Sequence, residues 1–161
     1  MQHIGIICVG KLSEAFYAAG TAEYEKRLTP LCRFDVTEIA PESINEKNGS
    51  DAVVQAALKK EGEKILAAVP AGSRMVALCV EGKQISSEDL CTYLQDAAML
   101  AKGGVVFVIG SSHGLWDEVK KSAHMRLSLS RLTFPHQMAR LLVTEQVYRA
   151  FQIARNSRYH K

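Results

Sequence analysis

The sequence predicts one α/β domain, residues 1–161, with a mostly parallel sheet and helices on both of its faces. Short apolar or β-branched runs alternate with longer amphipathic segments along the chain, which is the order expected of strand–helix–strand units with right-handed crossovers. The run 105–109 is continuously apolar, as in a strand that a parallel sheet buries on both faces. A chain of 161 residues is long enough to bury one full core without a second domain.

Strands are predicted at the short apolar or β-rich runs, at residues 4–9, 34–39, 75–80, 105–109 and 127–130. The first run ends at Gly10, which favours a turn into the helix that follows. The second run is followed by a polar stretch, 41–51, which contains an Asn-Gly pair and is therefore predicted to be a loop. Ligand crevices of such sheets lie beyond the carboxyl ends of the strands. The loops that follow strands are therefore the first places to search for a site.

Helices are predicted where apolar residues recur at helical spacing, at residues 14–28, between 51 and 70, between 86 and 103, at 118–123 and at 137–155. Asp51 is expected to cap the second of these helices, and Pro70 to end it. Ser86 and Asp89 have nearly the spacing and chemistry of a capping box at the start of the third. The glycines at 103–104 end that helix.

The last predicted helix, 137–155, is apolar on more than one face. One face carries Met138, Leu141, Leu142 and Tyr148, and another carries Val143, Val147, Phe151 and Ala154. A surface helix needs only one apolar stripe, so the excess predicts burial between the sheet and a second copy of the chain, in a homodimer. Glu145 and Arg149 are spaced to pair along this helix.

The charge of the chain is unevenly distributed. Residues 120–161 carry nine Lys and Arg against one acid, Glu145, so their net charge is +8, whereas residues 1–119 carry −5 and the whole chain +3. Clustered bases bind polyanions because they displace counterions from phosphates. The asymmetry therefore predicts a nucleic-acid partner at the C-terminal end, with a solvated basic helix as the alternative on charge alone.

The cysteines predict no metal site. Cys8, Cys32, Cys79 and Cys91 are far apart, without a C-x-x-C pair or a nearby His at metal-binding spacing. Two of them lie in apolar strand-like runs, where a free thiol behaves as a small hydrophobe in a reducing compartment.

No apolar run is long enough to cross a bilayer, and the N-terminus lacks the pattern of a secretory signal. We therefore expect a cytoplasmic location with no membrane partner.

The loop 110–114, Gly-Ser-Ser-His-Gly, directly follows a predicted strand and matches G-x-S-x-G. That pattern would make Ser112 the nucleophile of an α/β-hydrolase, whose triad needs a later acid and then a His. The acids after Ser112 are Asp117, Glu118 and Glu145. The first two are too close in sequence to come from another strand end, and the third lies mid-helix, so hydrolysis is the weaker interpretation.

Gly110 instead favours close approach of a ligand to the backbone, with a plain tight turn as the alternative. A G-x-G-x-x-G fingerprint for a dinucleotide is absent.

Several segments together resemble the small SPOUT-class RNA methyltransferases, namely 108–110, 129–137, 145–151 and 159–161, with 9–11 and 24–28 in the N-terminal part. The resemblance covers the length of the chain and is strongest in the basic quarter. It implies S-adenosyl-L-methionine as cofactor and methylation of N3 of a pseudouridine in 23S ribosomal RNA of the large subunit. It also implies a C-terminal trefoil knot and a homodimer. The alternative is a non-catalytic factor that binds ribosomal RNA, because the basic C-terminal end is equally expected of such a protein.

The resemblance also implies a cofactor site built from three segments that end at one edge of the predicted sheet. The implied residues are Leu78, Gly110, Leu129, Ser130, Arg131, Leu132, Thr133 and Phe134. Backbone groups would bind the polar edges of the cofactor, and the Leu and Phe side chains would form apolar walls.

Methylation at N3 requires a base, or a positive charge that favours the imide anion, because N3 of pseudouridine carries a proton. The candidates are His136, Arg149, Tyr159 and His160, and which of them is the base stays open. For His136 a structural role at a helix start is the alternative. Phosphate contacts are expected from Arg140, Arg155, Arg158 and Lys161.

Overall fold

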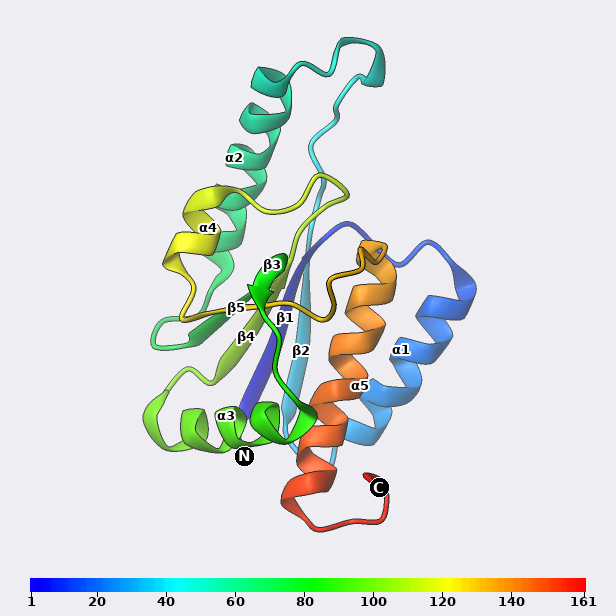
Figure 1. The fold of residues 1–161 in the computed structure, drawn as a ribbon, viewed down its shortest axis with the longest axis vertical. Helices are drawn as coiled ribbons and strands as arrows, with labels where there is room; N and C mark the ends of the chain where they lie inside the picture. The colour runs from blue at the N-terminus through cyan, green and yellow to red at the C-terminus, as the bar shows by residue number, and fades with distance from the viewer.

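The computed structural model (Figure 1) describes residues 1–161 apart from the side chain of Glu46. Its strands are β1 (His3–Val9), β2 (Arg33–Ile39), β3 (Arg74–Lys83), β4 (Val105–Ile109) and β5 (Met125–Leu127). Its helices are α1 (Ala15–Leu28), α2 (Asp51–Ala68), α3 (Ser87–Leu100), α4 (Asp117–Ser122) and α5 (His136–Ala154), with a 3-10 turn, η1, at Glu46–Asn48. Strands and helices alternate in the predicted order.

The strands form one sheet in the order β2-β1-β4-β3-β5, and every neighbouring pair is parallel. The predicted α/β class with a mostly parallel sheet is therefore confirmed. Because all strands run in the same direction, their carboxyl ends lie at one edge of the sheet. Strand β4 is inserted between β1 and β3, so the loop after β4 lies between the ends of two other strands.

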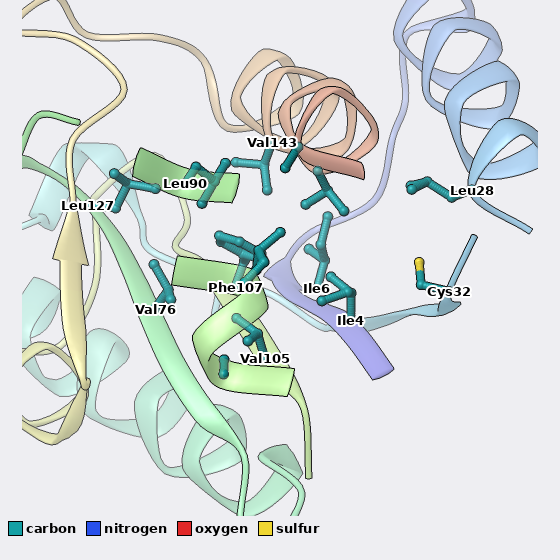
Figure 2. Close-up of a cluster of buried hydrophobic side chains, with 14 of the residues drawn as sticks. Ile4, Ile6, Leu28, Cys32, Val76, Leu90, Val105, Phe107, Leu127 and Val143 are labelled. Carbon is teal, nitrogen blue, oxygen red and sulfur yellow. The ribbon is translucent and has the colours of Figure 1, made fainter. Parts of the chain in front are cut away.

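The two faces of the sheet bury separate cores. Side chains such as Ile4 and Phe107 pack on one face against α1, α3 and α5, as Figure 2 shows for Val143 of α5. Ile7 faces the other side, where α2 and α4 cover the sheet and contribute side chains such as Val119. Successive residues of a strand point to opposite faces, so these continuously apolar strands are buried on both faces and helices cover both, as predicted.

Helix α5 is flanked by α1 and α3 of the same chain. Gly20 of α1 approaches it so closely that a Cβ there would lie 3.3 Å from Leu141. On the other side, the Ser87 hydroxyl of α3 donates to Gln146 at 2.6 Å. Of the apolar side chains on this helix, Val143 and Val147 are buried within the chain, whereas Met138, Leu141 and Tyr148 are half-buried. The burial of this helix against a second copy, the homodimer and the knot stay predictions.

The structure confirms the predicted capping box and corrects one predicted helix cap. The capping box of α3 is confirmed, because the Ser86 hydroxyl accepts from the Asp89 amide at 3.0 Å and the Asp89 carboxylate accepts from the Ser86 amide at 3.1 Å. The cap of α2 is Ser50 and not Asp51, since the Ser50 hydroxyl accepts from the Val53 amide at 3.4 Å. Asp51 is the first helical residue, where its charge suits the positive end of the helix dipole.

The last strand is shorter and earlier than predicted. It ends at Leu127, and the chain turns there because the Ser128 hydroxyl donates to the carbonyl of Ser130 at 2.8 Å. The segment 128–130 therefore belongs to the loop that leads to α5. Within the described residues, the helices include none that is both long and apolar enough to cross a membrane.

Candidate active site

A cavity of about 750 Å³ lies at the carboxyl ends of β3 and β4, beside the loop that follows β5. Its apolar lining includes Leu78, Ile109, Leu115, Leu127, Leu129, Leu132 and Phe134. Polar groups are fewer and come from Glu81, Ser111, Ser112, His113, Lys120, Ser130, Thr133 and His136. Apolar walls with a few polar groups are typical of sites for small molecules and cofactors.

The structure brings the predicted cofactor residues together at this cavity. All of them except Arg131 line it, although they come from three separate segments of the chain. Arg131 is exposed and its side chain is not part of the wall. The part of the prediction that concerned Arg131 is therefore not supported by its position.

The loop after β4, residues 110–114 (here the β4 loop), is a tight turn. The Gly114 amide donates to the Ser111 carbonyl at 2.9 Å, and a Cβ on Gly110 would overlap the Gly114 carbonyl. Gly114 itself has a φ of +88°, a conformation that favours glycine. The Cβ that Gly110 lacks would meet the main chain of the turn itself, so the structure contains the tight turn, and close approach of a ligand to this backbone stays a prediction.

The loop after β5 is shaped by serine hydroxyls. Ser128 bonds the Ser130 carbonyl, and the Ser130 hydroxyl accepts from the Leu132 amide at 3.0 Å. These bonds are local to the loop. They leave Leu132 71% exposed and place Phe134 half-buried on the cavity wall. Leu132 is thus an exposed apolar side chain beside the cavity.

The cavity fits S-adenosylmethionine in size and chemistry. Its volume falls within the range of about 300–1,000 Å³ typical of ligand pockets. The tight glycine turn leaves main chain open beside the cavity, and the leucines of β3 and of the loop after β5 supply an apolar wall for a flat ring. Among the side chains that the structure describes, no group of three His, Cys, Asp or Glu is arranged to hold a metal ion.

Sequence reasoning missed an ion pair at this cavity. The Lys120 ammonium of α4 lies 2.6 Å from the Glu81 carboxylate of β3, and both residues line the wall. The hydrogen bond from Lys120 lowers the pKa of Glu81. The position of Glu81, just after the predicted third strand, was the available signal, but nothing in the sequence indicated its partner.

His136 is the predicted catalytic residue that lies at the cavity. It is the first residue of α5, and its ring is next to Gly10 at the end of β1, where a Cβ would lie 3.4 Å from the His136 Nε2. Gly10 has a φ of +95°. The positive φ favours glycine here, and a Cβ would be in ordinary van der Waals contact with the imidazole, so the first β–α turn packs directly beside His136.

The other three predicted catalytic residues gather at the opposite end of α5, in what we call the tail cluster: Arg149, Tyr159 and His160, with Glu88 and Glu145. The Arg149 guanidinium lies 2.6 Å from the Glu145 carboxylate, which also accepts from the Tyr159 hydroxyl at 3.0 Å. His160 lies 2.7 Å from the Glu88 carboxylate of α3. His136 and Arg149 are separated by thirteen residues of helix, or about 20 Å at 1.5 Å per residue. One chain therefore does not bring its four candidates together.

The tail cluster holds Tyr159 in its neutral form. Burial, together with hydrogen bonds to Tyr24 and Glu145, raises the pKa of the Tyr159 hydroxyl far above its usual value. The Arg149 guanidinium stacks over the Tyr159 ring at 4.7 Å, and its hydrogen bond to Glu145 raises the pKa of Arg149. At neutral pH Tyr159 is a hydrogen-bond donor, not a base.

The predicted phosphate contacts divide into two groups. Arg155, Arg158 and Lys161 are exposed after the end of α5. Arg140 is 8% exposed, and its guanidinium donates to the Glu38 carboxylate of β2 at 3.0 Å. The expectation for Arg140 is therefore corrected, because a side chain buried in an internal ion pair is not available to phosphate. It shares a helix face with Val143 and Val147, and that spacing was the signal of burial.

The geometry does not support the hydrolase interpretation. Ser112 is exposed, and its hydroxyl lies 3.4 Å from the ring of the adjacent His113. Among the described side chains, the hydrogen bonds of His113 involve Ser112 and Ser111 and no carboxylate. A triad needs a third group that orients the imidazole.

Comparison with known proteins agrees with this geometry. A family model described as a predicted SPOUT methyltransferase matches residues 2–160, and the chain belongs to this family. Two similar proteins are both called Ribosomal RNA large subunit methyltransferase H. The one from Bacillus pumilus is 45% identical over 160 residues, covering 99% of this chain and 100% of that one. The one from Latilactobacillus sakei is 44% identical over 160 residues, with the same coverage. The predicted family is confirmed.

Two solved structures share the fold. A probable methylase family protein from Haemophilus influenzae has a TM-score of 0.56 and 16% identity, covering 98% of this chain and 70% of that one. A probable methyltransferase from Bordetella pertussis has the same score and identity, covering 92% and 93%. At this level of identity the likeness concerns the fold alone.

Proposed function

We propose that this protein transfers a methyl group from S-adenosylmethionine to N3 of a pseudouridine in the 23S ribosomal RNA of the large subunit. Membership of the SPOUT methyltransferase family and the name shared by its relatives support the reaction class and the RNA. The observation that carries the proposal is the cavity where the β3 and β4 ends meet the loop after β5, because it unites segments far apart in the sequence around a volume suited to the cofactor.

The chain's own residues would bind and orient the reactants. The bound cofactor supplies an activated methyl group, so the protein contributes mainly position and charge. Leu78 and Phe134 exclude water from one wall, and the backbone of the β4 loop faces another. His136 lies at the same cavity and is our candidate to accept the N3 proton.

We further propose that the protein acts as a homodimer in which the tail cluster of one protomer completes the cavity of the other. The distance of about 20 Å along α5 supports this, because the tail cluster lies at the far end of the helix from the cavity of its own chain. Arg149 would there stabilise the imide anion, with Tyr159 as a hydrogen-bond donor and His160 as a second candidate base. Arg155, Arg158 and Lys161, on the exposed end, would bind phosphates.

The test is a transfer assay with radiolabelled S-adenosylmethionine on large ribosomal subunits. We expect label in subunits that carry pseudouridine and none in matched subunits that carry uridine at the same sites, with the methyl group located by nuclease digestion and mass spectrometry. Titration calorimetry should show binding of the cofactor without added metal. Absence of cofactor binding would overturn the proposal, and RNA binding without transfer would favour the non-catalytic alternative.

A further inference from the structure

A buried carboxylate on α2, that of Glu61, contacts the β4 loop. Glu61 is 4% exposed, although glutamate is rarely buried without partners. One of its oxygens accepts from the Ser111 hydroxyl at 3.2 Å. The other accepts from the backbone amide of Glu42, in the segment after β2, at 3.0 Å. The side chain therefore links two loops that leave the sheet at its carboxyl edge.

The contact with the β4 loop extends beyond this hydrogen bond. The Ser111 hydroxyl also accepts from the His113 amide at 3.4 Å, so it joins Glu61 to the backbone of the turn. Next to Glu61, Gly62 fits against Trp116, where a Cβ would lie 2.6 Å from the indole ring. Helix α2 thus supports the loop at Ser111 and again just beyond it.

The Glu61 carboxylate offers one oxygen to each of two donors, the Ser111 hydroxyl and the Glu42 amide. A buried donor left without a partner costs more than the hydrogen bond itself contributes. A glutamine here would accept from the Glu42 amide with its oxygen and donate its NH2 to the Ser111 oxygen, because a hydroxyl both donates and accepts. Glu61→Gln is therefore the milder change, and loss of the Ser111 hydroxyl is the sharper one.

We propose that Glu61 is a positioning residue for the cofactor cavity, acting through Ser111 to hold the β4 loop in the conformation that lines it. Glu61 does not touch the cavity itself; Ser111 does. This inference rests on the proposed function, since the ligand whose binding it favours is S-adenosylmethionine.

The experiment compares Ser111→Ala, Ser111→Thr and Glu61→Gln, with Glu63→Gln as matched control because Glu63 is exposed on the same helix. Calorimetry measures cofactor affinity. Fluorescence of Trp116, the only tryptophan in the chain, and hydrogen exchange of residues 110–114 report the loop in the ligand-free protein. We expect Ser111→Ala to weaken cofactor binding about tenfold and to speed exchange of the loop. Glu61→Gln should act in the same direction with a smaller effect, because its amide still reaches both Ser111 and the Glu42 amide. Ser111→Thr, which keeps the hydroxyl, should restore most of the affinity.

The kinetics separate positioning from general damage. A loosened loop should raise KM for the cofactor more than it lowers kcat, because saturation restores the bound conformation. Normal affinity and normal exchange in Ser111→Ala would overturn the inference while leaving the proposed function intact. If the wild-type protein does not bind the cofactor, the proposed function fails, and loop exchange still decides whether Glu61 holds the loop. If Glu61→Gln proves too unstable, Ser111→Ala decides alone.

Discussion

The two ends of helix α5 carry different kinds of chemistry. At its N-terminal end, His136 borders a cavity with apolar walls and a glycine turn. At its other end the tail cluster consists of charges and aromatic rings that bond one another. The first end is suited to hold a small molecule, and the second to meet a charged or hydrogen-bonding group. The contrast shows that the candidate residues of this helix form two separate groups, which the proposed two-fold dimer would bring together.

The largest effect is expected at the cavity end. Gly110→Arg should abolish methyl transfer, by more than about a hundredfold, because any side chain there meets the Gly114 carbonyl and a long one also fills the cavity. Calorimetry should show no cofactor binding, with circular dichroism as the control for folding. Near-normal cofactor affinity in a folded variant would show that the β4 loop is not part of the cofactor site.

The relation between the two ends can be tested by mixing two inactive proteins. One carries Gly110→Arg, and the other is truncated after Asn156 and lacks the tail. If the tail acts on the partner's cavity, subunit exchange should restore up to about a quarter of wild-type activity, because half of the dimers are then mixed and each has one complete site. Mixed dimers that form but stay inactive would show that the tail serves its own chain.

The salt dependence of RNA binding distinguishes the exposed basic side chains after α5 from the buried Arg140. Alanine at Arg155, Arg158 or Lys161 should lower the slope of log affinity for RNA against log salt by about one each. Arg140→Ala should leave that slope unchanged and instead cost about 1–3 kcal/mol of folding free energy, since it breaks the partly buried pair with Glu38. Urea denaturation measures the second effect. A change of slope in Arg140→Ala without loss of stability would contradict the assignment.

The raised pKa of Tyr159 predicts a smaller effect at alkaline pH. The unfolded chain releases this proton near pH 10 while the folded chain keeps it, so the unfolded state binds fewer protons and stability falls as pH rises above about 10. Below that pH the contribution is fully present. Tyr159→Phe should therefore lose less stability than the wild type between pH 9 and pH 11, in urea denaturation at each pH. Equal losses would show that Tyr159 titrates normally.

The smallest effect is expected at Ser112. Ser112→Ala should leave methyl transfer within about twofold, because Ser112 is exposed and its hydroxyl bonds the ring of the adjacent His113 within the same loop. A serine-reactive phosphonate should not label the wild-type protein. Stoichiometric labelling of Ser112 would support the hydrolase interpretation instead.

Local signals in the sequence predicted much of this molecule. The alternation of strands and helices and the capping box at Ser86 each depend on residues close together in the chain, and the structure contains both. It also contains the tight turn at Gly110, which was the alternative to ligand approach there. The gathering of the Leu78, Gly110 and Phe134 segments was predicted from family resemblance, and it agrees with the parallel sheet because parallel strand ends meet at one edge.

The sequence by itself determined the class of fold, the position of the glycine loop and the basic C-terminal end, since these follow from periodicity, backbone freedom and charge. Only the tertiary structure decided where long-range partners lie. The pairing of Arg140 with Glu38 joins residues 102 apart, and the bond between Glu61 and Ser111 joins residues 50 apart. It also decided that His136 and the tail cluster lie at opposite ends of one helix. Such relations depend on the strand order and on helix packing, which are set by many distant contacts at once and leave no local pattern in the chain.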